Sequence, residues 1–238
     1  GKTNYYMGLS YMGQNGVVKV NPDSYNRFSV NYSTDTEIKS WLKVRSKALY
    51  TRTNLETPFN FNTASYDALY YLYRWPTIMP YGTYEGEPFR NSVTETAAAN
   101  MNSDIKDYMR FSVGATFVLG IPDLTLDVDY TYNLDNQNIT QRGGTVGGWD
   151  FWSGSMSLVD NWAATARNKV DKYQYNRNYH AGNAVLRYKH TWNDAHSLNV
   201  FGGMNIEYKE VDYVNAEKRD LLDQTKPEIS LAIEDKCI

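Results

Sequence analysis

The chain has 238 residues and a formal net charge of −3, and it shows no basic excess of the kind that nucleic-acid binding needs. Its mean hydropathy of −0.61 and the lack of any run of about 18 apolar residues exclude a helical membrane protein. The single cysteine, Cys237, excludes an internal disulfide framework, and the 21 Tyr, 6 Trp and 8 Phe residues fit either a membrane β-barrel or a soluble β-sandwich.

Seven segments alternate apolar and polar side chains with the period of two that is typical of an extended strand. In chain order these expected strands cover residues 3–14, 24–33, 40–51, 108–120, 122–136, 180–192 and 196–210. The pattern predicts an all-β, antiparallel fold, because the segments follow one another without long helical stretches between them.

The segment over residues 122–136 carries the most information. One of its faces holds Leu124, Leu126, Val128, Tyr130, Tyr132 and Leu134, and the other holds Thr125, Asp127, Asp129, Thr131, Asn133 and Asp135. A soluble strand usually has about five or six residues, whereas a tilted strand needs roughly 9–11 to cross a bilayer. The segment therefore predicts a wall strand of a membrane barrel, with lipid on one side and water on the other.

The connections alternate between short and long. Short, turn-rich links cover residues 33–39, 120–123 and 192–197, and long links cover residues 15–23, 54 to about 104, and about 141 to 175. Short turns at one rim and long loops at the other are typical of a bacterial outer-membrane barrel. Short helices are predicted over residues 65–74, with Ser65 as the cap, and over residues 216–224.

No segment predicts an enzyme or a cofactor site. His190 and His196 flank a turn near His180, which suggests a metal pair, but a third ligand at a fitting spacing is missing, so hydrogen bonding at the rim is favoured. The acidic row Asp127, Asp129 and Asp135 suggests either a cation site or, in preference, a polar inner wall that answers a basic row. That basic row holds Lys43, Arg45 and Lys47.

The aromatic residues of the long loops are the best candidates for ligand binding. One loop carries Trp75, Tyr81, Tyr84 and Phe89, and another carries Trp149, Phe151, Trp152 and Trp162. A flat ring with a polar edge suits the C–H face of a sugar, and loops commonly carry binding residues. The predicted ligand contacts are Trp75, Tyr81, Tyr84, Trp149, Trp152 and Arg74, with Glu85 as a further hydrogen-bonding group. The alternative is that the rings pack the loops onto one another or onto a partner protein.

Residues 8–51 resemble the early barrel of SusC/RagA-like TonB-dependent outer-membrane transporters. In that family a glycine-ended strand leads to a "Y-x-R-x-S-x-N" strand and then to a "WLK" strand. The matching residues here are Gly16, then Tyr25, Arg27, Ser29 and Asn31, then Trp41, Leu42 and Lys43. The segment from Ala68 to Phe89 resembles the external segment of the family, and the likeness runs from about Asn4 to at least Tyr208.

The resemblance implies outer-membrane import of a bulky nutrient, commonly an oligosaccharide and sometimes a peptide, in a Gram-negative bacterium. It implies a barrel of about 22 strands with an N-terminal plug, a SusD-like lipoprotein lid, a TonB complex that supplies energy through the plug, and a surrounding lipid bilayer. The chain departs from this pattern because no plug and only about seven strands are visible, and because its last eight residues do not resemble the closing strand of the family. We therefore expect residues 1–238 to form one part of a transmembrane barrel domain, without plug and closing strands. The alternative is a soluble or surface-exposed β-sandwich that binds glycans without transport.

Overall fold

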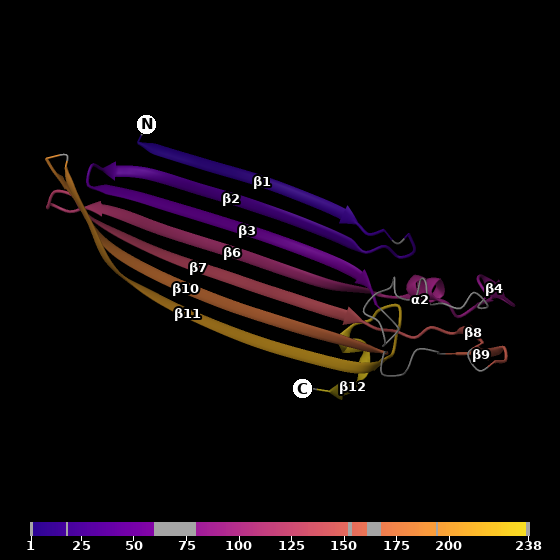
Figure 1. Cartoon of the computed structure of the whole chain (residues 1–238). Helices are drawn as coiled ribbons and strands as arrows, with labels where there is room; N and C mark the ends of the chain where they lie inside the picture. Colours follow the sequence, from indigo (N-terminus) through magenta and orange to yellow (C-terminus); the bar gives the residue numbers. More distant parts are fainter. Residues whose placement is uncertain are drawn as a thin grey trace.

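The computed structural model describes residues 2–17, 19–59, 80–151, 154–160, 168–193 and 195–236. In these ranges one antiparallel sheet of eight strands dominates, in the order β1-β2-β3-β6-β7-β10-β11-β12. Its strands are β1 (Thr3–Asn15), β2 (Ser24–Lys39), β3 (Leu42–Pro58), β6 (Met101–Val118), β7 (Leu124–Arg142), β10 (Lys169–Trp192), β11 (His196–Leu221) and β12 (Ala232–Lys236). The strands lie side by side in the same order in which they follow one another along the chain, so the topology is an up-and-down meander (Figure 1).

Short elements gather at one end of the sheet. They are β4 (Thr83–Tyr84), β5 (Glu87–Pro88), α2 (Ser92–Ala98), β8 (Gly148–Asp150), β9 (Ser157–Val159) and the 3-10 helix η2 (Ile229–Leu231). The tight turns β2–β3, β6–β7 and β10–β11 lie at the opposite end (Figure 1). We call these two ends the loop end and the turn end.

The seven strands expected from the alternating segments are confirmed, and every one of them lies within a strand or overlaps most of one. The expected strand number was too low, because β12 adds an eighth strand that pairs with β11 at Glu217–Leu221. The helix expected over residues 216–224 is wrong: residues 216–221 continue β11, where Ala216 pairs with Lys172 of β10. Pairing with two neighbouring strands overrides the helical propensity of this segment. The helix expected over residues 65–74 lies outside the described residues.

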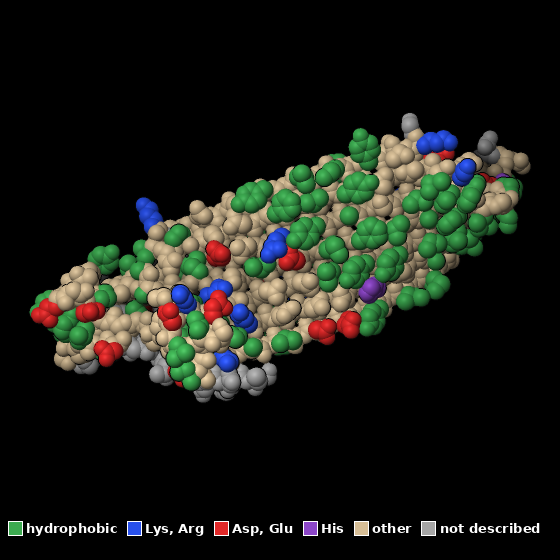
Figure 2. Space-filling view, turned by 180° about the vertical axis from the view of Figure 1, so that it is seen from behind, with side chains coloured by type: hydrophobic (Ala, Val, Ile, Leu, Met, Phe, Trp, Pro, Cys, Tyr) green, Lys and Arg blue, Asp and Glu red, His purple; other side chains and the backbone are tan. Residues whose placement is uncertain are grey.

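The strand register joins the apolar positions into one continuous face. One row across the strands is Leu9, Val30, Tyr50, Met109 and Leu134, and a second row is Val44, Ala115, Val128, Ala184 and Met204. We call this side of the sheet the apolar face and the other side the polar face. Figure 2 shows hydrophobic side chains spread over the apolar face along most of its length.

The apolar face is banded along the strands. On β7 the apolar residues run from Leu124 to Leu134, a span of about 33 Å at roughly 3.3 Å per residue. At the roughly 40° tilt of barrel strands this span gives a belt about 25 Å tall, the height of the apolar band of membrane barrels. Beyond Leu134 the same face turns polar, and its next row holds Arg52, Asp107, Asn136, Asn176 and Asp212.

Little of the described chain is buried in a conventional core. One buried cluster holds Val170, Leu221 and Ala232, with Ile229 packed against it, and another holds Ala99 and Val146. Both clusters lie at the loop end, whereas the large side chains of the apolar belt are exposed. A single sheet has no second layer to cover this face, so the belt needs an apolar environment from elsewhere.

Candidate functional site

The loops between β3 and β6 and between β7 and β10 meet at the loop end through two small hairpins. β4 and β5 are joined by Glu85 and Gly86, which both have positive φ (52° and 86°). Two such residues in succession make a type I′ turn, the connection that matches the twist of paired strands. The second hairpin pairs Trp149 of β8 with Leu158 of β9, and a bridge between Phe89 and Trp149 links the two hairpins.

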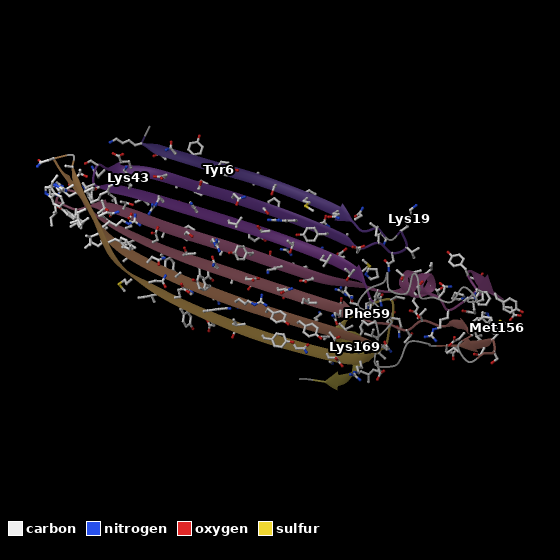
Figure 3. The ribbon with its side chains drawn as sticks, viewed as in Figure 1. Tyr6, Lys19, Lys43, Phe59, Met156 and Lys169 are labelled. Carbon is white, nitrogen blue, oxygen red and sulfur yellow. The ribbon has the colours of Figure 1, made fainter. Side chains whose placement is uncertain are left out.

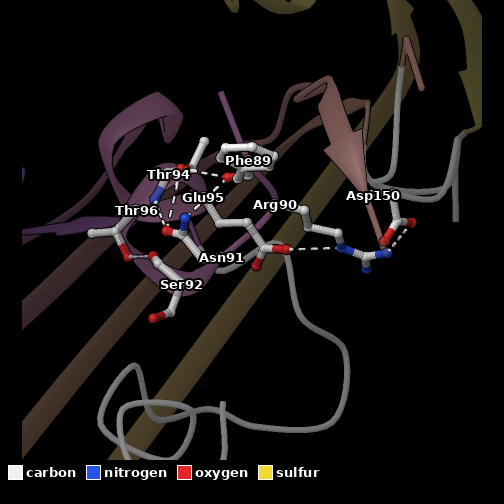
Figure 4. Close-up of polar contacts among 8 residues, drawn as sticks. All are labelled: Phe89, Arg90, Asn91, Ser92, Thr94, Glu95, Thr96 and Asp150. Atoms are coloured by element: carbon white, nitrogen blue, oxygen red, sulfur yellow. Dashed lines mark hydrogen bonds and ion pairs between the residues drawn. The ribbon is translucent and has the colours of Figure 1, made fainter. Parts of the chain in front are cut away.

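The helix α2 follows the first hairpin and has a satisfied cap at each end. Asn91, which is 5% exposed, accepts a hydrogen bond at Oδ1 from the backbone N–H of Thr94 (2.9 Å) and donates one from Nδ2 to the carbonyl of Phe89 (3.0 Å; Figure 4). At the other end, Nδ2 of Asn21 donates to the carbonyls of Thr96 (3.0 Å) and Ala99 (2.7 Å). The β1–β2 loop therefore holds the helix in place, because it satisfies carbonyls that the helix leaves open.

Arg90 joins the two hairpins through charge. Its Nη1 lies 2.9 Å from Oδ2 of Asp150, and its Nε lies 3.7 Å from Oε1 of Glu95 (Figure 4). Its backbone N–H also donates to the carbonyl of Trp149 (2.9 Å). The guanidinium and both carboxylates are largely buried, so these pairs are screened less than surface ion pairs.

The aromatic residues of the two hairpins pack on one another. Tyr84 and Trp149 meet edge to face with centroids 5.5 Å apart, and the indole N–H of Trp149 donates to the carbonyl of Tyr84 (2.8 Å). The ring centroid of Phe89 lies 6.4 Å from that of Tyr84 and 5.9 Å from that of Phe151. The structure therefore brings Tyr84 and Trp149 of the predicted ligand contacts together, in a cluster that fixes the loops to each other.

The other predicted contacts have different outcomes. Tyr81 is 78% exposed and makes none of the ring contacts of this cluster. Arg74, Trp75 and Trp152, together with Trp162, lie outside the described residues. Ligand contact stays a prediction for all six residues, which are Arg74, Trp75, Tyr81, Tyr84, Trp149 and Trp152.

Two members of the acidic row on β7 form ion pairs with basic side chains of other strands. Arg45 lies 3.3 Å from Asp129 and 3.9 Å from Asp127, and Arg187 lies 3.4 Å from Asp127. Gly114 sits between Arg45 and Asp129 in the same cross-strand row, where an added Cβ would lie 2.1 Å from a carboxylate oxygen of Asp129. The glycine therefore gives the ion pair room to cross β6.

A second charged cluster lies on the polar face at the loop end. Its residue Glu217 lies seven residues further along β11 than Glu210, which is level with Leu134 at the edge of the apolar belt. Lys169 Nζ lies 2.8 Å from Asp171 and 3.0 Å from Glu217, and Arg219 Nε lies 2.7 Å from Glu217. Burial of Asp171, which is fully buried, raises the pKa of its carboxyl. Burial alone would raise the pKa of Glu217 too, but hydrogen bonds from Arg219 and Lys169 lower that pKa to about 2.

The histidines take part in separate hydrogen bonds. Nδ1 of His190 lies at hydrogen-bond distance from Oδ2 of Asp123 in the β6–β7 turn, and Nδ1 of His180 lies 2.7 Å from the hydroxyl of Tyr130. Within the described ranges, no three His, Cys, Asp or Glu side chains lie close enough together to hold a metal ion.

Sequence reasoning missed a group of tyrosines on the polar face near the loop end. Tyr173 and Tyr175 of β10 lie beside Tyr213 of β11, with ring centroids 6.5 Å and 4.7 Å from that of Tyr213. The signal was the spacing of two between Tyr173 and Tyr175, which places both on one face of a strand. The pairing with Tyr213 bridges 38 residues of chain and follows only from the register of β10 and β11.

A scan against protein-family models and a search of the curated proteins give no match to this chain. Solved structures do match in fold. The RagAB peptide transporter aligns with 100% of this chain at a TM-score of 0.68 and 14% identity. The RagAB peptide importer aligns with 100% in its "open-open" state (TM-score 0.73, 15% identity) and with 98% in its "closed-closed" state (0.68, 16%).

This chain covers 26% of each of those chains, so it spans about a quarter of the length of the structures it matches. At such identities the likeness concerns the fold: the eight-stranded antiparallel sheet follows the backbone of a β-barrel transporter. The matching proteins are transporters rather than enzymes. In the part of this chain that the structure describes, no helix is long and apolar enough to cross a membrane.

Proposed function

We propose that this chain is one part of the barrel domain of an outer-membrane transporter of the SusC/RagA-like kind, which imports a bulky nutrient with energy from a TonB complex. The nutrient is an oligosaccharide or, as the second choice, a peptide. The observation that carries the proposal is the apolar belt, because it continues across the long strands on a face that the described chain leaves uncovered. Its height of about 25 Å fits the hydrocarbon region of a bilayer.

The alternative, a soluble glycan-binding β-sandwich, requires a second sheet about 10 Å from this face. The other sheets that the described residues form are the small pairs β4–β5 and β8–β9. Both of these pairs lie at the loop end rather than over the belt (Figure 1). The membrane barrel therefore accounts for the exposed belt better than the sandwich does.

The loop assembly has two roles in this proposal. Tyr81, Tyr84 and Trp149, with Arg74, Trp75 and Trp152, contact the nutrient at the external mouth. The same exposed tip receives a SusD-like lipoprotein lid, for which the exposed Met156 and Leu158 of the second hairpin supply apolar surface. A TonB complex acts through the plug region of the transporter.

The test is to fractionate the source cells and to follow the native protein with an antibody against residues 80–100 and 143–160. We expect a band in the outer membrane that only detergent extracts. Surface labelling of intact cells should reach these loops and should not reach an epitope at the β6–β7 turn, because the two lie at opposite ends of the sheet (Figure 1). A band that stays soluble and monomeric without detergent contradicts the proposal.

A further inference from the structure

The three tyrosines of the polar face form a ladder that is open to solvent on one side. Tyr175 lies directly opposite Tyr213 in the register, and Tyr213 is 50% exposed. The guanidinium of Arg177 lies 5.0 Å from the ring centroid of Tyr175 and extends the ladder by one step toward the turn end. Lys169, labelled in Figure 3, marks the end of β10 from which the ladder starts. We call Tyr173, Tyr175 and Tyr213 the tyrosine ladder.

A hollow of about 260 Å³ lies next to the ladder. It is lined by Leu55, Thr57, Asn102, Ser103, Asp104, Ile139 and Gln141. The register places Ile139 of β7 directly beside Tyr173 of β10, so the hollow and the ladder adjoin. Pockets for drug-sized ligands usually hold roughly 300–1,000 Å³, so this hollow fits one ring or one side chain of a longer ligand.

The cationic side chains around the ladder are paired within the sheet. Arg177 and Lys106 both lie 3.4 Å from Oδ2 of Asp135, and Asp104 accepts hydrogen bonds from the amide of Gln137 (3.0 Å). Beyond Tyr173, Lys169 lies between Asp171 and Glu217. An anionic ligand would therefore have to displace an existing ion pair to reach a cation, whereas a neutral ligand would not.

We propose that the ladder and the hollow form a contact site for a pyranose ring of a neutral glycan, separate from the loop aromatics. The ladder offers rings to the C–H face of the sugar, and Asn102, Asp104 and Gln141 offer donors and acceptors to its hydroxyl groups. This inference rests on the proposed function, because it requires the polar face to line the import path. It adds a site on the wall of that path to the contacts at its mouth.

The test uses the full-length protein, purified in detergent, with the pair Tyr175→Leu and Tyr213→Leu. Tyr6→Leu is the matched control, since Tyr6 is an exposed tyrosine of the polar face on β1, which lies five strand positions from β10 in the sheet (Figure 3). A second pair, Tyr175→Phe and Tyr213→Phe, keeps the rings. The probes are neutral heptasaccharides of glucose, mannose and xylose and, as a comparison, mixed heptapeptides, all measured by calorimetry.

We expect one heptasaccharide to bind the wild type. The leucine pair should lower its affinity about tenfold, because two stacking contacts together account for roughly one power of ten. The phenylalanine pair and Tyr6→Leu should each change the affinity less than about threefold. Equal binding by the leucine pair and the wild type overturns the site and leaves the importer proposal standing. Binding of peptides alone also overturns it. If the leucine pair fails to fold, Ile139→Trp is added to the phenylalanine pair. The tryptophan side chain would fill the hollow, so this variant must bind the heptasaccharide more weakly than the phenylalanine pair alone, and equal binding overturns the site.

Discussion

A charged side chain in the apolar belt provides the sharpest test of the membrane-barrel proposal. Val128 lies near the middle of the belt, four residues from Leu124 and six from Leu134, and its side chain is 38% exposed. In a bilayer the substitution Val128→Lys would place an ammonium group close to the midplane. Such a change costs about 2–4 kcal/mol in membrane barrels.

The matched control is Asn138→Lys on the same strand and the same face. Asn138 lies four residues beyond Leu134, about 13 Å along the strand outside the belt. There the same change should cost no more than about 1 kcal/mol, because the group reaches water. The measurement is the free energy of unfolding in urea of the full-length protein refolded into lipid vesicles. Equal losses for the two variants would refute the proposal that the belt faces lipid.

Three further predictions follow from the polar contacts. Gly114→Ala should lower the free energy of unfolding by about 1–3 kcal/mol, because its Cβ would crowd the Arg45–Asp129 pair. The control Gly182→Ala should hardly change the free energy of unfolding, because nothing lies within 4 Å of its added Cβ. Similar losses for the two variants would contradict this reason. Arg90→Met should leave Asp150 without its 2.9 Å partner and make the bonds around residues 148–160 several-fold more sensitive to protease, whereas Glu87→Gln in the exposed hairpin should not. The pKa of Glu217 is lowered from an ordinary 4.5 to about 2, so its carboxylate stabilises the folded state above about pH 4.5, and this contribution is lost as the pH falls toward 2. Glu217→Gln should therefore make the free energy of unfolding depend less on pH between 4.5 and 2. An unchanged pH dependence would contradict the lowered pKa of Glu217.

Reasoning from the sequence located the strands and their faces well, because both depend on local spacing. The alternation from Leu124 to Leu134 determines which side chains share a side of β7, whatever strand pairs with it. The expectation that the basic row answers the acidic row is confirmed for one pair, because Arg45 lies 3.3 Å from Asp129. The error at residues 216–221 arose where local propensity favoured a helix and two neighbouring strands imposed β structure.

The sequence alone therefore determined an all-β chain of long, two-faced strands, since a period of two needs only neighbouring residues. Tertiary structure decided which residues meet across the sheet and between the loops. Arg45 reaches Asp129 across 84 positions, Asn21 caps a helix more than 70 residues away, and Arg90 joins Asp150. Such pairs depend on register and loop closure, which no local pattern encodes. The tyrosine ladder belongs to the same class, because Tyr175 and Tyr213 become neighbours only when β10 and β11 pair.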